Sequence, residues 1–281
     1  ADAASIVAAV RNAIFEWAEF LHLRAIPVVV VAALAFVWIA ARGAPPPGPT
    51  IGFLAAVLLT QVAIALDNNW CDRDLDAATK PWRLIPRGVV SARAAQLGSW
   101  LFLAAGIIVS LAVSPAVAAL VALGTACGFV YDHGVDRTIA SIVPFAIALP
   151  TLAVAAFAVV GRADLLVPVA YLVGAPLVVA IHLADAIPDI VADRSAGASG
   201  LAARLGSGAA RAVCWAAFAL AATVIVLIRP RGGSPGILLV AGLALFGVAL
   251  ALARRPHVHR VLLSLAALAL AADWLGDLAA G

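Results

Sequence analysis

Two short segments, 67–76 and 185–194, hold seven of the 15 acidic residues of this chain. In each segment, oxygen-bearing side chains recur every four residues: Asn68, Asp72 and Asp76 in the first, and Asp185, Asp189 and Asp193 in the second. On a helix, this interval places three side chains on roughly one face, one turn apart. Each segment therefore predicts a helical stripe of side-chain oxygen atoms.

Carboxylates one turn apart repel one another, and each of them loses part of its hydration. A hard cation removes the repulsion, and Mg²⁺ prefers oxygen ligands and commonly bridges protein carboxylates to substrate phosphates. Two such stripes facing one another would hold Mg²⁺ and a diphosphate, and would draw electrons toward that diphosphate as it departs. The alternative is that both segments are merely solvated helix ends at a membrane surface. Two observations argue against this alternative: the two segments have the same spacing, and both are predicted to lie on the same side of the membrane.

The composition indicates an integral membrane protein. Of the 281 residues, 65% are hydrophobic and 12% are charged, whereas about 25% of residues are charged in a typical soluble domain. The net charge is +3, but the basic residues flank apolar stretches and do not suggest a nucleic-acid-binding protein. Cys71, Cys127 and Cys214 are isolated in the sequence and predict neither a disulfide framework nor a zinc site.

Nine apolar stretches have roughly the length that a membrane-spanning helix requires. They cover residues 25–42, 51–68, 97–113, 116–131, 139–160, 165–184, 211–228, 235–253 and 260–276. The sequence thus predicts an all-α protein with a single transmembrane domain over residues 1–281. Within it, the amphipathic start, residues 1–24, is expected to form an interfacial helix. The second and sixth stretches both end in an acidic segment, which is the pattern that an internal duplication of four-helix blocks would leave.

The distribution of basic residues predicts the orientation in the membrane. All but four of the 18 Lys and Arg residues lie at the N-terminus or after even-numbered stretches. The four on the other side are Arg42, Arg162, Arg229 and Arg231. By the positive-inside rule, the N-terminus and both acidic segments face the cytoplasm, which predicts a multi-pass protein of the cytoplasmic membrane with its active site on the cytoplasmic side.

These motifs resemble those of the UbiA superfamily of intramembrane prenyltransferases. The first motif of that family, NDxxDxxxD, matches residues 68–76 at three of its four defined positions. A family loop of the type KPxRPIPxG resembles residues 80–88, and the second motif, DxxxDxxxG, fits residues 189–197, with Arg-Leu-Gly following at 204–206. Nine spans, with the motifs after the second and sixth, also agree with the family. The resemblance covers nearly the whole chain.

The resemblance implies a nine-helix bundle with a central cavity open to the cytoplasm, together with specific site residues. Mg²⁺ would be held by Asn68, Asp72, Asp76, Asp185, Asp189 and Asp193, and Asp72, Asp76, Asp189 and Asp193 would be essential for catalysis. The diphosphate would be bound by Lys80, Arg83, Arg194, Arg73, Arg137 and Arg24, because arginine binds phosphate in a bidentate way. The substrate pocket would include Asn69, Tyr131 and His182, although an internal hydrogen bond is the commoner role of such a histidine.

Three positions depart from the family pattern. Asn69 stands where the family most often has aspartate, Asp136 occupies the position where a basic residue is expected, and Gly200 replaces a usual threonine. Arg137 is the candidate to supply the cation that Asp136 does not. These departures leave the identity of the acceptor open.

The implied activity is Mg²⁺-dependent transfer of a prenyl group from an isoprenyl diphosphate to a small hydrophobic acceptor in the bilayer, of the aromatic or lipid-like kind. A terpene cyclase of the same superfamily is the first alternative, since it ionises the same kind of diphosphate without an acceptor. A transporter with acidic gates is the second alternative, because intramembrane carboxylates also mark ion paths. The position of the carboxylates at helix ends favours the enzymatic hypotheses.

Overall fold

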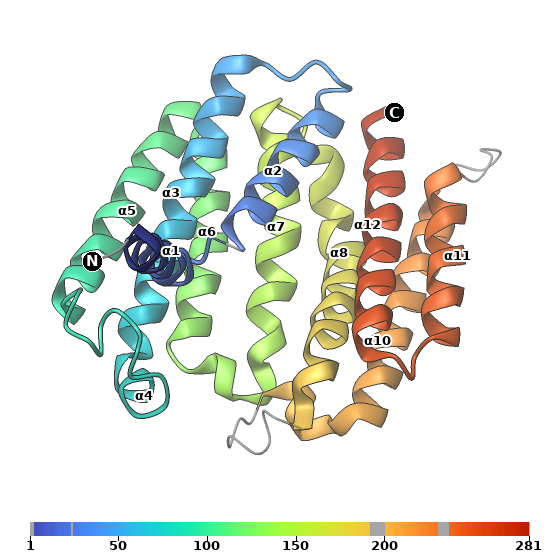
Figure 1. The fold of residues 1–281 in the computed structure, drawn as a ribbon. Helices are drawn as coiled ribbons and strands as arrows, with labels where there is room; N and C mark the ends of the chain where they lie inside the picture. The colour runs from blue at the N-terminus through green and yellow to red at the C-terminus, as the bar shows by residue number, and fades with distance from the viewer. Residues whose placement is uncertain (1–2, 24, 192–199, 230–235, 281) are drawn as a thin grey trace. The chain divides into compact units, whose positions relative to one another are not determined.

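The computed structural model describes all residues except 1–2, 24, 192–199, 230–235 and 281, and this part of the chain contains helices and no strand (Figure 1). The α-helices are α1 (Ala3–Phe20), α2 (Ile26–Ala40), α3 (Pro47–Cys71), α4 (Arg73–Thr79), α5 (Ala92–Val113), α6 (Pro115–Asp132), α7 (Val143–Val159), α8 (Ala163–Ala186), α10 (Leu201–Ile228), α11 (Ile237–Ala251) and α12 (Pro256–Ala280). Three 3₁₀ turns accompany them: η1 (Val135–Arg137), η2 (Ile139–Ile142) and η3 (Ile187–Asp189). The all-α prediction is confirmed for the described residues.

Among the described residues, seven helical stretches are long and apolar enough to cross a membrane. They are Pro47–Cys71, Ala92–Val113, Pro115–Asp132, Ile139–Val159, Val169–Asp189, Leu201–Ile228 and Pro256–Ala280. The helices α2 and α11 have only 15 residues each, which is about 22 Å of helix against a hydrocarbon core of about 30 Å. The chain is therefore a multi-pass membrane protein, and the count of nine spans stays a prediction.

The chain forms two compact units, the first comprising residues 1–35 and 47–133 and the second comprising residues 36–46 and 134–281. In the first unit, α3, α5 and α6 pack against one another. Gly52 near the start of α3 meets Val113 at the end of α5, whereas Leu66 near the end of α3 meets Gly98. The two helices are therefore antiparallel, with small residues at their close approaches, as is common between membrane helices.

Local signals set the turns of the first unit. The Ser91 hydroxyl accepts a hydrogen bond from the amide of Ala94 at the start of α5. The Ser114 hydroxyl accepts one from Val117 at the start of α6, where Pro115 occupies the first turn. Serine and proline satisfy or remove amide groups that a helix start leaves unbonded. Because α5 and α6 are joined by one residue, the C-terminal ends of α3 and α6 lie at the same end of this unit.

In the second unit, α7 packs against α8, α8 packs against α10 and α12, and α11 packs against α12. Rings of Phe218 and Phe246 stack between α10 and α11 with centroids 4.2 Å apart. Near the end of α10, the guanidinium of Arg229 donates to Asp273 of α12 over 2.7 Å. The sequence predicted only loop positions for Arg229, and the structure instead gives this residue a buried carboxylate partner.

Two other arginines of the weakly basic side bind helix ends. Arg162 donates to the carbonyl oxygens of Ala40 and Ala279 over 3.0 and 2.8 Å, and Arg42 donates to those of Ala279 and Ala280. Carbonyl groups in the last turn of a helix have no intrahelical partner and attract cations. The described arginines that the sequence placed outside the basic loops thus have specific structural partners.

Gly242→Ala is expected to destabilise the second unit by about 1–3 kcal/mol. A Cβ atom there would clash with Leu270 and would lie 3.0 Å from the carbonyl oxygen of Ala266, so α11 and α12 would have to separate. Gly247→Ala, on the same helix and with nothing within 4 Å of its added Cβ, is the matched control and should be neutral or stabilising. Thermal unfolding of both variants in detergent measures the difference. Equal melting temperatures would contradict the close packing of these helices.

Candidate functional site

The first acidic segment lies where α3 passes into α4. The two helices are separated at Asp72, yet backbone hydrogen bonds continue across this residue. The amide of Asp72 donates to the carbonyl oxygen of Asn68 over 2.9 Å. In the same way, the amide of Asp76 donates to the carbonyl oxygen of Asp72 over 2.8 Å, and that of Lys80 to the carbonyl oxygen of Asp76 over 2.7 Å. Three successive bonds of the i to i+4 type therefore carry the helical register across the break. The side chains of Asn68, Asp72 and Asp76 follow one another at turn spacing, which is the geometry that the sequence predicted for a stripe.

Asn68 and Asp72, the first two residues of this stripe, have side-chain oxygen atoms suited to a cation. The Asn68 amide nitrogen donates to Asp132 Oδ1 at the end of α6 over 3.0 Å. This bond occupies the donor side of the amide and leaves its oxygen as the available ligand atom. Asp72 is the N-cap residue of α4, but its side chain makes no capping hydrogen bond. Amide and carboxylate oxygens of this kind are the donor set that Mg²⁺ prefers.

Asp76 has a different environment from the other two members of the stripe. Its side chain is 3% exposed, with Lys80 Nζ at 3.5 Å and Arg83 Nη1 at 2.7 Å. Two of the six cations predicted to bind diphosphate therefore contact this carboxylate. A buried carboxylate requires such compensation, and the pairing fixes where the two cations lie. The structure thus brings Asp76, Lys80 and Arg83 together.

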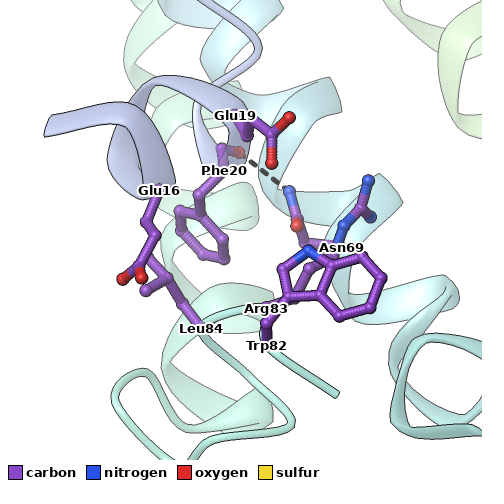
Figure 2. A pocket seen from close by; sticks show the side chains of 7 residues that line it. All are labelled: Glu16, Glu19, Phe20, Asn69, Trp82, Arg83 and Leu84. Atoms are coloured by element: carbon purple, nitrogen blue, oxygen red, sulfur yellow. Dashed lines mark hydrogen bonds between the residues drawn. The ribbon is translucent and has the colours of Figure 1, made fainter. Parts of the chain in front are cut away.

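Asn69 points away from the stripe toward α1. It is 4% exposed, and its amide nitrogen donates to the carbonyl oxygens of Phe20 and Ala65 over 2.8 and 2.6 Å. Figure 2 shows this amide at a small hollow lined by Glu16, Glu19, Phe20, Asn69, Trp82, Arg83 and Leu84. A carboxylate at this position would face two carbonyl oxygens. The departure from the aspartate of the family motif therefore has a local structural reason.

The end of α1 docks on the loop that follows the motif. Glu16 Oε1 lies 2.7 Å from Arg87 Nη1, and Phe20 packs in a buried cluster with Leu66, Leu84 and Ala95. The sequence indicated an amphipathic helix here but assigned no site role to Glu16, Glu19 or Phe20. The signal that could have found them is Asn69 itself, because an amide inside an acidic motif needs acceptors from another element.

His22 lies in the connection between α1 and α2 with a left-handed backbone, φ 50°. Burial and the charge of Arg83 lower the pKa of His22 below its ordinary value of 6.5, while Asp72 opposes this shift. The sequence gave His22 no site role. Because its pKa lies below the ordinary value, this imidazole is predominantly neutral at pH 7.

Acidification is expected to weaken the fold around His22. Well above pH 6.5, both the folded and the unfolded chain hold a neutral imidazole, so His22 contributes no pH dependence. Below pH 6.5, the unfolded chain takes up a proton that the folded chain resists, and stability falls. His22→Asn, which tolerates the left-handed backbone, should show a smaller loss of melting temperature between pH 7.5 and 5 than the wild type. A variant with the same pH profile as the wild type would contradict this assignment.

Arg73 folds back onto α3. Its guanidinium lies 4.7 Å from the ring centre of Trp70, donates to the Trp70 carbonyl oxygen over 2.8 Å, and lies 3.3 Å from Asp74. These contacts occupy the guanidinium of Arg73, and its role as a diphosphate ligand stays a prediction. Tyr131 lies in the last turn of α6 with a half-buried side chain.

The second acidic segment, in the second unit, is less regular than the sequence predicted. α8 ends at Ala186, and the 3₁₀ turn η3 with Pro188 at its centre carries the chain to Asp189. Asp185 is exposed and lies 3.2 Å from Arg260 of α12, and Asp189 is also exposed. The helical stripe predicted over 185–193 is therefore interrupted by the turn. Asp193 and Arg194 lie outside the described residues, as does Arg24 of the first unit.

Other predicted residues of the second unit have specific neighbours. The ring of His182 lies 5.0 Å from that of Phe145, centre to centre. Arg137 Nε lies 3.5 Å from its neighbour Asp136, and both belong to η1. A Cβ atom at Gly200 would lie 3.3 Å from the carbonyl oxygen of Asp136. The usual threonine would be crowded there, which gives Gly200 a local reason.

Apolar membrane helices with an oxygen stripe, and with basic side chains at its end, define a multi-pass membrane protein with a candidate cation and phosphate site. The model of the UbiA prenyltransferase family matches residues 28–274. The chain therefore belongs to the UbiA prenyltransferase family. None of the curated proteins compared with the chain matches it.

Several solved structures share the fold of this chain. A structure of digeranylgeranylglyceryl phosphate synthase has a TM-score of 0.74 and 16% identity, covering 94% of this chain and 98% of its own. The apo UbiA homologue from Aeropyrum pernix K1 has a TM-score of 0.63 and 21% identity, covering 87% and 96%. The UbiA homologue from Archaeoglobus fulgidus bound to DMAPP and Mg²⁺ has a TM-score of 0.63 and 15% identity, covering 90% and 99%. At sequence identities this low, the similarity establishes a shared fold and nothing about the residues of the site.

Proposed function

We propose that this protein is a Mg²⁺-dependent intramembrane prenyltransferase, which transfers the prenyl group of an allylic isoprenyl diphosphate to a small hydrophobic or aromatic acceptor. One observation carries the proposal. The stripe of Asn68, Asp72 and Asp76 keeps helical register and ends at two cations, Lys80 and Arg83, held by Asp76. Oxygen ligands for a metal and cations for a phosphate therefore occur within a few turns of one chain segment.

The residues present fit Mg²⁺. Asn68 has its donor nitrogen bonded to Asp132, which leaves its amide oxygen as a ligand atom, and Asp72 places a carboxylate one turn further along the stripe. A UbiA homologue with the same fold is bound to DMAPP and Mg²⁺, which supports the same cofactor and substrate class here. Asp185, Asp189 and Asp193 are proposed as further ligands from the second acidic segment. When bound, Mg²⁺ supplies positive charge that neutralises the developing charge of a leaving diphosphate.

The basic residues hold and orient the diphosphate. Arg83 and Lys80 come first, because Asp76 fixes both of them, and Arg73, Arg137, Arg194 and Arg24 are further candidates. The bond between C1 of the prenyl group and the diphosphate oxygen breaks with both electrons going to oxygen. The acceptor then supplies the electron pair for the new bond to C1 and loses a proton to solvent or a nearby base. Asn69, Tyr131 and His182 are proposed to line the substrate pocket.

The proposed location is the cytoplasmic membrane, with the N-terminus and the active site on the cytoplasmic side. The asymmetry of basic residues supports this orientation. Arg42, Arg162 and Arg229 are exceptions to this asymmetry. They bind helix ends and a buried carboxylate, so these positions have structural contacts of their own and the orientation keeps its support.

Purified protein in liposomes tests the function directly. Allylic diphosphates of increasing chain length are supplied with Mg²⁺, with and without a panel of aromatic and lipid-like acceptors, and diphosphate release and prenylated products are measured. Release that requires both Mg²⁺ and an acceptor supports prenyl transfer. A cyclic hydrocarbon or alcohol formed without acceptor would establish the cyclase alternative instead. Absence of Mg²⁺-dependent release with every diphosphate would overturn both.

A further inference from the structure

A second group of ligand-type side chains lies at the same end of the first unit as the stripe. Asp67 and Cys71 are one turn apart on α3, and His133 is the C-cap residue of α6. Asp67 Oδ2 lies 3.3 Å from His133 Nδ1 and 3.9 Å from Cys71 Sγ, and Sγ lies 3.8 Å from Nδ1. A carboxylate, a thiol and an imidazole therefore converge on one point.

The donor types distinguish this group from the Mg²⁺ stripe. Mg²⁺ takes oxygen ligands almost exclusively, whereas sulfur with imidazole nitrogen selects zinc and related transition metals. Asp67 and Cys71 each precede a stripe residue by one position, so they lie about 100° around the helix from Asn68 and Asp72. The two sets of ligands thus belong to different faces of the same helix end.

The distances suit a tetrahedral ion. Zinc bonds of about 2.3 Å to sulfur and about 2.0–2.1 Å to nitrogen or oxygen place tetrahedral ligand atoms about 3.3 Å apart for nitrogen and oxygen, and about 3.5 Å apart when one is sulfur. The observed separations are 3.3 Å for the nitrogen–oxygen pair and 3.8 and 3.9 Å for the pairs with sulfur. A shift of a few tenths of an ångström at Cys71 would close the triangle around an ion.

Burial gives the carboxylate a need for positive charge. The side chain of Asp67 is 3% exposed, and that of His133 is 50% exposed. Burying an ionised carboxylate costs free energy unless a cation or hydrogen-bond donors compensate for it. An ion could reach Asp67 from the solvent-exposed side of His133.

The imidazole has a second polar contact at the same nitrogen. His133 Nδ1 lies 2.8 Å from the carbonyl oxygen of Phe129, so without an ion this nitrogen carries a proton that it donates there. A metal ion at Nδ1 would take the place of that proton. The competing arrangement has no ion, and His133 Nδ1 then keeps its hydrogen bond to the Phe129 carbonyl oxygen.

We propose that Asp67, Cys71 and His133 form a binding site for one divalent transition metal of the zinc class, separate from the Mg²⁺ stripe. The isolated cysteines in the sequence predicted no zinc site. That expectation considered cysteine pairs, whereas this site uses one cysteine with two other residue types. The ion would join the ends of α3 and α6 beside Asn68, whose amide binds Asp132 on α6.

Cobalt absorption tests the site without reference to catalysis. Tag-free protein stripped with chelator is titrated with Co²⁺ in excess Mg²⁺. We expect one Co²⁺ per chain, with a sulfur-to-cobalt charge-transfer band and tetrahedral d–d bands, all displaced by Zn²⁺. Cys71→Ser should abolish the sulfur band. The same substitution at Cys127, a buried cysteine on α6 of the same unit, should leave it unchanged.

Two further variants test whether loss of the cobalt spectrum is specific to the proposed ligands. His133→Gln, at an exposed position, should also abolish the tetrahedral spectrum, which guards against a Cys71 variant that merely unfolds. Asp72→Asn should retain the spectrum, because the stripe is a different site. A wild-type protein without a sulfur band, or a band that survives in Cys71→Ser, would overturn the proposal. Since no activity is measured, neither result bears on prenyl transfer.

Discussion

Replacing Asp72 with asparagine is expected to lower Mg²⁺-dependent diphosphate release by about 10²–10³-fold. Asparagine keeps the shape of the side chain and one oxygen atom but removes the negative charge that balances the metal. The backbone bonds of residue 72 with Asn68 and Asp76 do not involve the side chain, so the helix should persist. Single-turnover release measured over a range of Mg²⁺ concentrations checks the prediction, and the variant should also require more Mg²⁺.

Asp74→Asn is the matched control. It makes the same chemical change two residues away, on a side chain that is 86% exposed and whose 3.3 Å contact to Arg73 lies at the surface. A surface pair of this kind contributes about 1 kcal/mol at most, so release should change by less than about tenfold. If both variants lost activity equally, the effect would come from the overall charge of the segment. The role of the stripe would then be rejected.

The helical register of the first segment could be predicted from the sequence because it depends on local bonds. Spacing by four residues places Asn68, Asp72 and Asp76 one turn apart wherever backbone bonds of the i to i+4 type continue, and they do continue here. The start of α6 also depends on local signals, because Ser114 and Pro115 act within the first turn of the helix. Long apolar runs also predicted most of the transmembrane helices, because lipid requires the backbone to bond within each helix.

The partners of polar side chains could not be predicted, because they come from distant parts of the chain. Asp185 and Arg260 are 75 residues apart in sequence, and nothing in the acidic motif points to α12. The break at Pro188 was visible in the sequence, but the regular spacing of Asp185, Asp189 and Asp193 obscured it. Asp67 and His133 likewise meet only because α3 and α6 end at the same side of their unit.

Restoring the family residue by Asn69→Asp is expected to destabilise the protein by about 3–5 kcal/mol. The Asn69 amide donates to two carbonyl oxygens, of Phe20 and Ala65, in a buried position. A carboxylate would lose both hydrogen bonds and would place a negative charge against both acceptors. The end of α1 should then detach from α3, which thermal unfolding and hydrogen exchange of the α1 amides would detect.

Asn69→Ala and Asn68→Asp separate the contributions to this loss. Alanine at position 69 removes the hydrogen bonds without adding charge, so it should destabilise less than aspartate does. Asn68→Asp makes the identical chemical change one residue earlier, where the side chain is only half-buried and bonds to Asp132, and it should leave the α1 amides protected. If Asn69→Asp were as stable as the wild type and more active, position 69 would instead supply a metal ligand. The tie between α1 and α3 would then not be the reason for asparagine at this position.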